Sequence, residues 1–190
     1  SWFSFPNYPW RMGAHWLHTG DDFEPALGFV RRRGGRSASF HSSYSFKLEN
    51  HPVIDDLTVA AAYSRYDLLD GGLDTEGVNL KLIEIRTHEG DRCDFSIEFE
   101  REILTAPFEI VDGIEVAVGD YRQVEFEFEW SSSAKRPFFM EMEIKYGDYY
   151  LGDALKLESR FFYRPSRFVH YQLGGDLTDA DMPVGNFEAW

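Results

Sequence analysis

The chain has 190 residues, and its 43% hydrophobic and 17% aromatic content is that of a folded domain, which excludes a disordered chain. Its formal net charge of −14 excludes nucleic acid as a partner, because a phosphate-binding surface needs clustered Lys and Arg side chains. The only cysteine, Cys93, excludes an intrachain disulfide and a cysteine-based zinc site. No apolar run approaches the roughly 20 residues that a membrane-spanning helix needs. The first residues carry no signal-peptide pattern, so we expect any targeting sequence to lie outside this chain.

Apolar and polar residues alternate with a period of two along most of the chain, which is the pattern of β-strands and not of helices. The sequence therefore predicts an all-β fold, an antiparallel up-and-down meander of about nine to ten strands that forms one domain over residues 1–190. In chain order, the predicted strands cover residues 1–5, 10–19, 38–49, 57–63, 78–82, 93–100, 124–130, 138–146, 155–163 and 169–173, and residues 187–190 begin another.

The clearest alternation is the segment VEFEFEW, residues 124–130, in which every second residue is a glutamate and the others are apolar. One face of this strand is therefore apolar and the other acidic. A soluble sheet turns its apolar face to a core, whereas a membrane barrel turns it to lipid and keeps the polar face for its lumen.

The lengths of the strands and connections favour the membrane barrel. The longest predicted strands, 10–19, 38–49, 138–146 and 155–163, have about ten residues each, close to the 9 to 11 that a tilted strand needs to cross a bilayer. Short connections at 50–56, 88–91, 131–137 and 164–167 alternate with long ones at 19–35, 67–76, 102–119, 147–153 and 178–186. In a meander this places tight turns at one rim and long loops at the other, as outer-membrane barrels do.

Aromatic residues lie near both ends of the predicted strands, as in the interfacial girdles of membrane barrels. Trp130, Phe138 and Tyr163 flank short turns, while Tyr63, Tyr121 and Tyr146 lie toward the long loops. The sequence thus predicts a transmembrane β-barrel, or a segment of a larger one, with the lipid bilayer of a bacterial outer membrane as its partner. The alternative is a soluble periplasmic or extracellular β-barrel or sandwich that binds a ligand or hydrolyses sugar.

In the membrane interpretation, the acidic rows face the lumen. The predicted outward rows contain Phe126, Phe128, Met140, Met142, Leu155 and Leu157. The predicted lumen-facing acidic row consists of Glu125, Glu127, Glu129, Glu141, Glu143 and Glu158. Because these acids outnumber the cations expected on that face, Lys81, Lys145, Lys156 and Arg160, an open lumen should prefer cations weakly.

The search for reactive groups yields little. The six histidines have no metal-site spacing, and no nucleophile or phosphate-loop motif occurs. Paired glutamates on a wet face could hydrolyse glycosides, and loop acids such as Asp70 and Asp74 could bind calcium, but solvated surfaces explain both more simply. We therefore expect no catalytic residues, no metal and no cofactor.

The one basic cluster comprises Arg31, Arg32, Arg33 and Arg36. Planar guanidinium groups bind phosphate and carboxylate well. The cluster could therefore contact lipopolysaccharide phosphates outside the barrel, or pair with the acidic lumen if its loop folds inward. We favour inward pairing, because the lumenal acids otherwise repel one another.

A family resemblance rests on several loop segments. They are HTGDDFEPALGFVRRRGGR at 18–36, PFEI at 107–110, VGDY at 118–121, YGDYYLGD at 146–153 and DMPVGNF at 181–187. In this order they resemble the carboxy-terminal barrel region of a bacterial outer-membrane family of unknown function. In that family a module similar to family-nine carbohydrate-binding domains precedes the barrel.

The resemblance implies a barrel that anchors a carbohydrate-binding module or passes small polar solutes or cations. The sugar-binding module is absent from these residues, so a carbohydrate ligand is implied only through that module. At the end of the chain, Asn186 and Glu188 interrupt the apolar row before Trp190. We therefore expect the chain to be a segment of a longer barrel.

Overall fold

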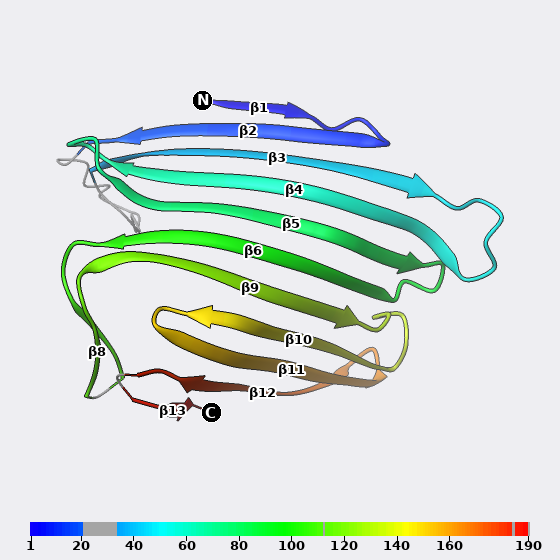
Figure 1. The fold of residues 1–190 in the computed structure, drawn as a ribbon. Helices are drawn as coiled ribbons and strands as arrows, with labels where there is room; N and C mark the ends of the chain where they lie inside the picture. The colour runs from blue at the N-terminus through cyan, green and yellow to red at the C-terminus, as the bar shows by residue number, and fades with distance from the viewer. Residues whose placement is uncertain (21–33, 112, 184, 190) are drawn as a thin grey trace.

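The computed structural model describes residues 1–20, 34–111, 113–183 and 185–189. These residues form an antiparallel meander sheet of 11 strands in the order β1-β2-β3-β4-β5-β6-β9-β10-β11-β12-β13 (Figure 1). The all-β meander is thus confirmed, with slightly more strands than the sequence predicts. The strands are β1 (Trp2–Phe5), β2 (Trp10–Thr19), β3 (Gly35–Lys47), β4 (Ile54–Leu68), β5 (Leu73–Thr87), β6 (Arg92–Leu104), β9 (Gly119–Ser131), β10 (Phe138–Tyr149), β11 (Gly152–Ser166), β12 (Val169–Asp181) and β13 (Phe187–Ala189).

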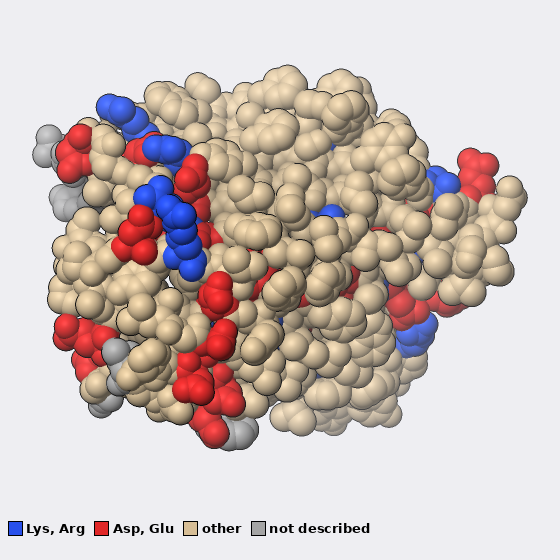
Figure 2. Space-filling view, in the orientation of Figure 1, with Lys and Arg blue, Asp and Glu red and all other residues tan. Residues whose placement is uncertain are grey.

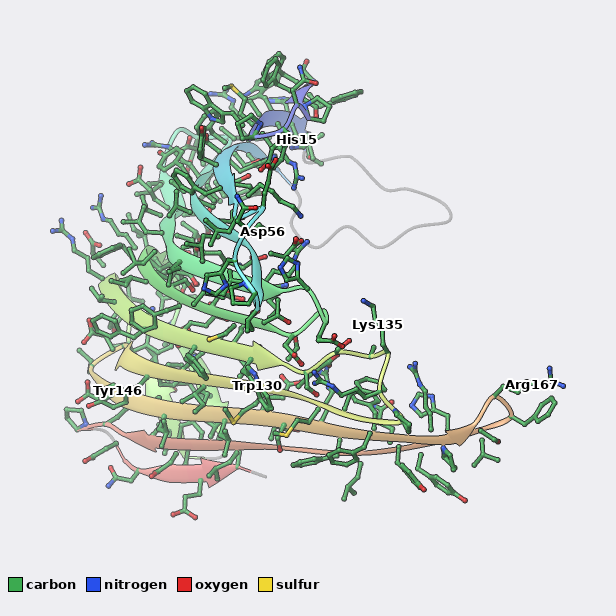
Figure 3. All side chains as sticks on the ribbon, turned by 90° about the vertical axis from the view of Figure 1, so that its right-hand side faces the viewer. His15, Asp56, Trp130, Lys135, Tyr146 and Arg167 are labelled. Carbon is green, nitrogen blue, oxygen red and sulfur yellow. The ribbon has the colours of Figure 1, made fainter. Side chains whose placement is uncertain are left out.

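The sheet is curved and open. In Figure 3 it bends from β1 and β2 at one end of an arc to β12 and β13 at the other, and its strand direction turns progressively along the arc. Such turning follows from the right-handed twist of each strand. Within the described ranges, β1 and β13 each pair with one neighbour only, so the sheet has two free edges.

The connections alternate between the two ends of the sheet as predicted, but two of them are shorter than the sequence suggests. Residues 67–76 and 147–153 were expected to form long loops. Instead β4 continues to Leu68 and β5 begins at Leu73, and only Tyr150 and Leu151 separate β10 from β11. The sequence prediction was wrong here because the residues at these strand ends are polar, as in loops, although they continue the hydrogen-bonded pairing of the strands.

The long connection between β6 and β9 contains a hairpin that the sequence did not predict. It consists of β7 (Phe108–Val111) and β8 (Ile114–Val116). Figure 1 shows β8 beside the ends of β12 and β13, and the side chain of Ile114 lies against Gly185 in the connection between them. The hairpin therefore covers one corner of the sheet, at the end where the long connections lie (the loop end).

Buried apolar side chains are few among the described residues. They are Ile114, Val116, Tyr121, Phe139, Ala154, Ala180 and Met182. Five buried residues are polar or charged, among them Glu84 and Asp94. The part of the chain that the structure describes therefore lacks the large apolar core that a 43% hydrophobic composition could supply. No helix that could span a membrane occurs in the described ranges.

At the turn end, Asp91 links two neighbouring hairpins. Its carboxylate accepts hydrogen bonds from the Arg136 guanidinium at 2.5 and 2.7 Å and from the backbone N–H of Ser133 at 2.9 Å. The Thr87 hydroxyl donates a further bond at 3.3 Å. The Arg136 pairing is the main cause that lowers the pKa of Asp91 to about 2. Asp91 thus ties the β5–β6 turn to the β9–β10 turn.

We predict that Asp91→Asn lowers the free energy of unfolding by about 1 kcal/mol, because a partly exposed charged hydrogen bond is lost. The native pKa lies below the unfolded value, so the ionised carboxylate stabilises the fold above about pH 4. That contribution disappears as the pH falls toward 2 in the wild type, and it is absent from the variant. Denaturant titrations at several pH values measure both effects. Glu89→Gln in the same turn is the matched control, and equal losses in the two variants would contradict the role of Asp91.

Candidate functional site

The register of the strands separates the sheet into a polar face and an apolar face. In β6, β9 and β10, Asp94 lies opposite Glu129, and Glu129 opposite Glu143. Phe95, Phe128 and Ile144 occupy the alternate positions in the same three strands. Because side chains alternate along a strand, these two rows point to opposite sides. All six residues of the predicted acidic row belong to the polar face: Glu125, Glu127, Glu129, Glu141, Glu143 and Glu158.

The polar face is the hollow side of the arc. Asp56, which is in register with Lys47 and Arg86 on this face, lies within the hollow in Figure 3. The convex side, seen in Figure 2, is largely uncharged across its middle. Side chains on a concave surface converge, which brings the charged groups of neighbouring strands within reach of one another.

Much of the acidic row is paired with cations. Lys145 Nζ lies 2.6 Å from a Glu143 oxygen and 3.3 Å from a Glu127 oxygen. Lys156 Nζ lies 2.7 Å from Glu125, and Arg160 contacts Glu158. The Lys145–Glu127 and Lys156–Glu125 pairs connect β9 with β10 and β11, and all four pairs reduce the repulsion within the row.

A second cluster, on β5, β6 and β9, centres on Glu84 and Asp94, whose side chains are only 11% and 3% exposed. Lys81 Nζ lies 3.1 Å from Glu84 and 3.0 Å from Asp94. Arg92 contacts Asp94 at 2.8 Å and Glu129 at 2.9 Å, and Arg86 contacts Glu84 at 3.0 Å. These buried charges are therefore paired, which offsets the cost of removing them from water.

The sequence missed Glu84 and Arg86 because of an irregularity in β5. The pairing of β5 with β6 shifts between Lys81 and Ile83, so Glu84 falls on the same face as Lys81 although it lies an odd number of positions, three, further along the strand. A β-bulge of this kind reverses the alternation, and the predicted row ended at Leu82. Arg92, by contrast, is two residues before Asp94, so the period-two pattern could have found it.

Two acids of the polar face, Glu98 and Glu141, make no ion pair or hydrogen bond within the described ranges. Recesses of about 240 Å³ and 160 Å³ lie on this part of the face. The larger is lined by Glu141 and Glu143, and the smaller by Glu98 and Glu125. The surface over β6 to β11 therefore retains excess negative charge.

One group of carboxylates has the spacing of a metal site. Ligand atoms of Glu127, Glu129 and Glu143 lie within 4.8 Å of one another. Lys145 is paired with two of them and Arg92 with the third. Each of these three acids thus already contacts a basic side chain, and we assign no metal or cofactor to them.

The apolar face is open to solvent in the isolated sheet. Phe99, Phe126 and Leu82 are 43%, 44% and 46% exposed. Asp94 and Ser96, which lie on the other face of β6, are each 2% exposed. This distribution is the reverse of that in a soluble protein, where large apolar side chains are buried and charged side chains are exposed to solvent. The outward row predicted from the sequence lies on this exposed face.

Charged residues bound the apolar face at its loop end. Arg65 contacts Asp67 at 2.8 Å and Glu76 at 3.7 Å, and Arg101 contacts Asp120 at 2.7 Å. Figure 2 shows a band of blue and red side chains at the left of the convex side. Tyr63, at the adjoining position, donates its hydroxyl to Glu76 at 2.6 Å. At this end of the sheet, the apolar face is therefore bounded by a tyrosine and by charged side chains.

Two expectations about the loop end need correction. Arg36 is in register with Asp67 on the apolar face, so it does not reach the polar face as inward pairing requires. Arg31, Arg32 and Arg33 lie outside the described residues. Tyr121 lies on the polar face opposite Glu102, is 7% exposed and donates its hydroxyl to the Ala117 carbonyl, so it is not on the apolar face where a girdle residue was expected.

Comparison of the chain with known proteins found no matching family model, curated protein or solved structure. The outer-membrane family resemblance and the functions it implies therefore remain predictions.

Proposed function

We propose that this sheet is one arc of a transmembrane β-barrel in a bacterial outer membrane, with its apolar face toward lipid and its polar face toward an aqueous lumen. The observation that carries the proposal is the reversed burial of the two faces. Phe126, on the apolar face of β9, is 44% exposed, whereas Asp94, on the polar face of the neighbouring strand β6, is 2% exposed. In a membrane barrel, lipid would cover Phe126, and Asp94 would face the lumen, where it is hydrated or paired with a cation.

The size of the apolar face supports this proposal. On β11, the outward row runs from Leu155 to Tyr163 and is apolar except at Ser159. At about 3.4 Å per residue these eight steps cover about 27 Å along the strand. A tilt of about 40° reduces the height to about 20 Å, near the roughly 25 Å apolar band of outer-membrane barrels. The face is thus tall enough for a bilayer core.

A soluble β-protein is the competing interpretation, and it requires a second layer over the apolar face. The described residues contribute only the β7–β8 hairpin outside the main sheet, and that hairpin covers one corner. A soluble protein would leave Phe126, Tyr146 and Leu155 in contact with water. The membrane proposal therefore explains the exposed face with fewer assumptions.

Closure of the barrel requires strands beyond the arc. With 11 strands in the meander, β1 and β13 run in the same direction, and pairing them directly would create a parallel seam. A fully antiparallel barrel has an even number of strands. An odd number of further strands would close it. The family resemblance suggests that such a barrel anchors a carbohydrate-binding module.

We predict that Phe128→Arg costs about 2 to 4 kcal/mol of folding free energy in lipid vesicles, because it places a cation near the middle of the bilayer. Glu127→Gln on the polar face should cost less, since the amide keeps a hydrogen-bond acceptor for Ser96. Reversible urea titrations of the protein refolded into vesicles give both values. A larger loss for Glu127→Gln than for Phe128→Arg would mean that the two faces are assigned the wrong way round.

A second candidate function is the passage of small cations, which the excess acid over β6 to β11 favours. Glu125, Glu127 and Glu129 are each engaged by basic or hydroxyl groups, so replacing them also frees cations. Glu98 and Glu141 have no such partners in the described ranges. They are therefore the acids whose removal changes the net charge with least disturbance.

We expect the current through the complete barrel to show a weak cation preference, because screening over about 8 Å limits the effect of the wall. The double variant Glu98→Gln and Glu141→Gln should reduce that preference. Reversal potentials in planar bilayers under a salt gradient measure it, with Glu49→Gln and Glu89→Gln together, both in turns, as the charge-matched control. An anion preference in the wild type, or an unchanged preference in the double variant, would argue against cation passage.

A further inference from the structure

The polar face contains a third recess, at the turn end of β2 to β6, whose charge differs from the rest of the wall. Its volume is about 330 Å³. It lies on the hollow side of the sheet, where Figure 3 shows Asp56, one of its lining residues. The other lining residues are Tyr8, Arg11, Ser43, Ser45, Thr58, Ala60, Lys81, Glu84, Arg86 and Arg92.

Cations outnumber acids around this recess. Arg11, Lys81, Arg86 and Arg92 face only Asp56 and Glu84 within the lining. The two recesses over β6 to β11 have the opposite balance, with more carboxylates than basic groups. The hollow face is therefore divided into a cationic area on β2 to β6 and an acidic area on β6 to β11.

The cations of the recess are not equally engaged. Lys81 and Arg92 are each shared between Glu84 and Asp94, and Arg92 also reaches Glu129. Arg86 is 51% exposed and uses only Nη2 for its ion pair with Glu84. Arg11 is exposed, and no ion pair joins it to any of the described residues. Arg11 and Arg86 therefore keep N–H donors for another group.

Hydroxyl groups lie beside these free donors. Ser43 is the register partner of Arg11. The Ser45 and Thr58 hydroxyls share a hydrogen bond of 2.8 Å, while Tyr8 adds a phenol at the rim. Guanidinium forks together with hydroxyl donors are the groups that recognise carboxylate and phosphate oxygens.

We propose that this recess binds an oxyanion, the carboxylate or phosphate group of a small polar solute, between Arg11 and Arg86. The ligand replaces the water that otherwise solvates the two guanidinium groups, and the nearby hydroxyls donate to its remaining oxygens. Asp56 opposes the ligand charge from the strand next to Arg86, because the two residues are in register. The site needs only the described arc, so it does not depend on closure of the barrel.

Titration calorimetry of the detergent-solubilised protein with sodium phosphate and with sodium acetate tests the proposal, at constant ionic strength set by sodium chloride. We expect at least one of the two anions to bind. Arg11→Gln and Arg86→Gln should each weaken binding about tenfold, the loss expected for one charged hydrogen bond. Preference for acetate would identify a carboxylate ligand, and preference for phosphate a phosphorylated one.

Two further variants separate the site from general damage to the fold. Asp56→Asn should strengthen binding, which a partly unfolded protein cannot do. Arg160→Gln, which removes a cation from the acidic area, should leave binding unchanged. Absence of binding to both anions in the wild type, or equal weakening by Arg160→Gln and Arg11→Gln, would overturn the proposal.

Discussion

The two-residue alternation within the strands, which bulges such as the one in β5 interrupt locally, is the constraint on which the rest of the structure depends. Each long strand presents apolar side chains to one side and polar side chains to the other, and the ladders hold neighbouring strands in the same phase. A slip of one residue between β9 and β10 would place Glu127 beside Ile144 and expose charge on the apolar face. The register therefore decides which solvent each face can meet.

The electrostatics of the hollow face follow from that register. Because the sheet curves toward its polar side, Lys81, Arg92 and Lys145 each reach acids on neighbouring strands. These pairs stabilise a wall that would otherwise repel itself, and they restrict the excess charge to particular places. The acids Glu98 and Glu141 lie in the acidic area, while Arg11 and Arg86 supply free donors in the cationic area. One surface can therefore present different chemistry to different groups of a solute.

The sequence predicts the strands well because the alternation is a local property of the chain. Residues 124–130 show both faces without ambiguity, and 138–146 and 155–163 follow the same pattern except at Phe139 and Phe162, which are apolar residues on the polar face. Features that depend on other strands escape this reasoning. The bulge near Lys81 moves Glu84 to the polar face, and only the pairing with β6 reveals it. Tyr121 looks like a girdle residue, yet its position one step out of the apolar row places it on the other face. The curvature and the free edges of the sheet depend on how all the strands pair, so they cannot be predicted from the residue pattern of a single strand.

The account rests on lipid contact by the apolar face, and spin labels placed along β9 test that contact most directly. In a Cys93→Ser background, single cysteines at each position from 124 to 130 would carry a nitroxide in protein refolded into vesicles. Collisions with oxygen, which concentrates in lipid, should be most frequent at Val124, Phe126, Phe128 and Trp130. Collisions with a water-soluble nickel chelate should be most frequent at Glu125, Glu127 and Glu129. The opposite phase, or high nickel accessibility at all seven positions, would contradict the membrane wall.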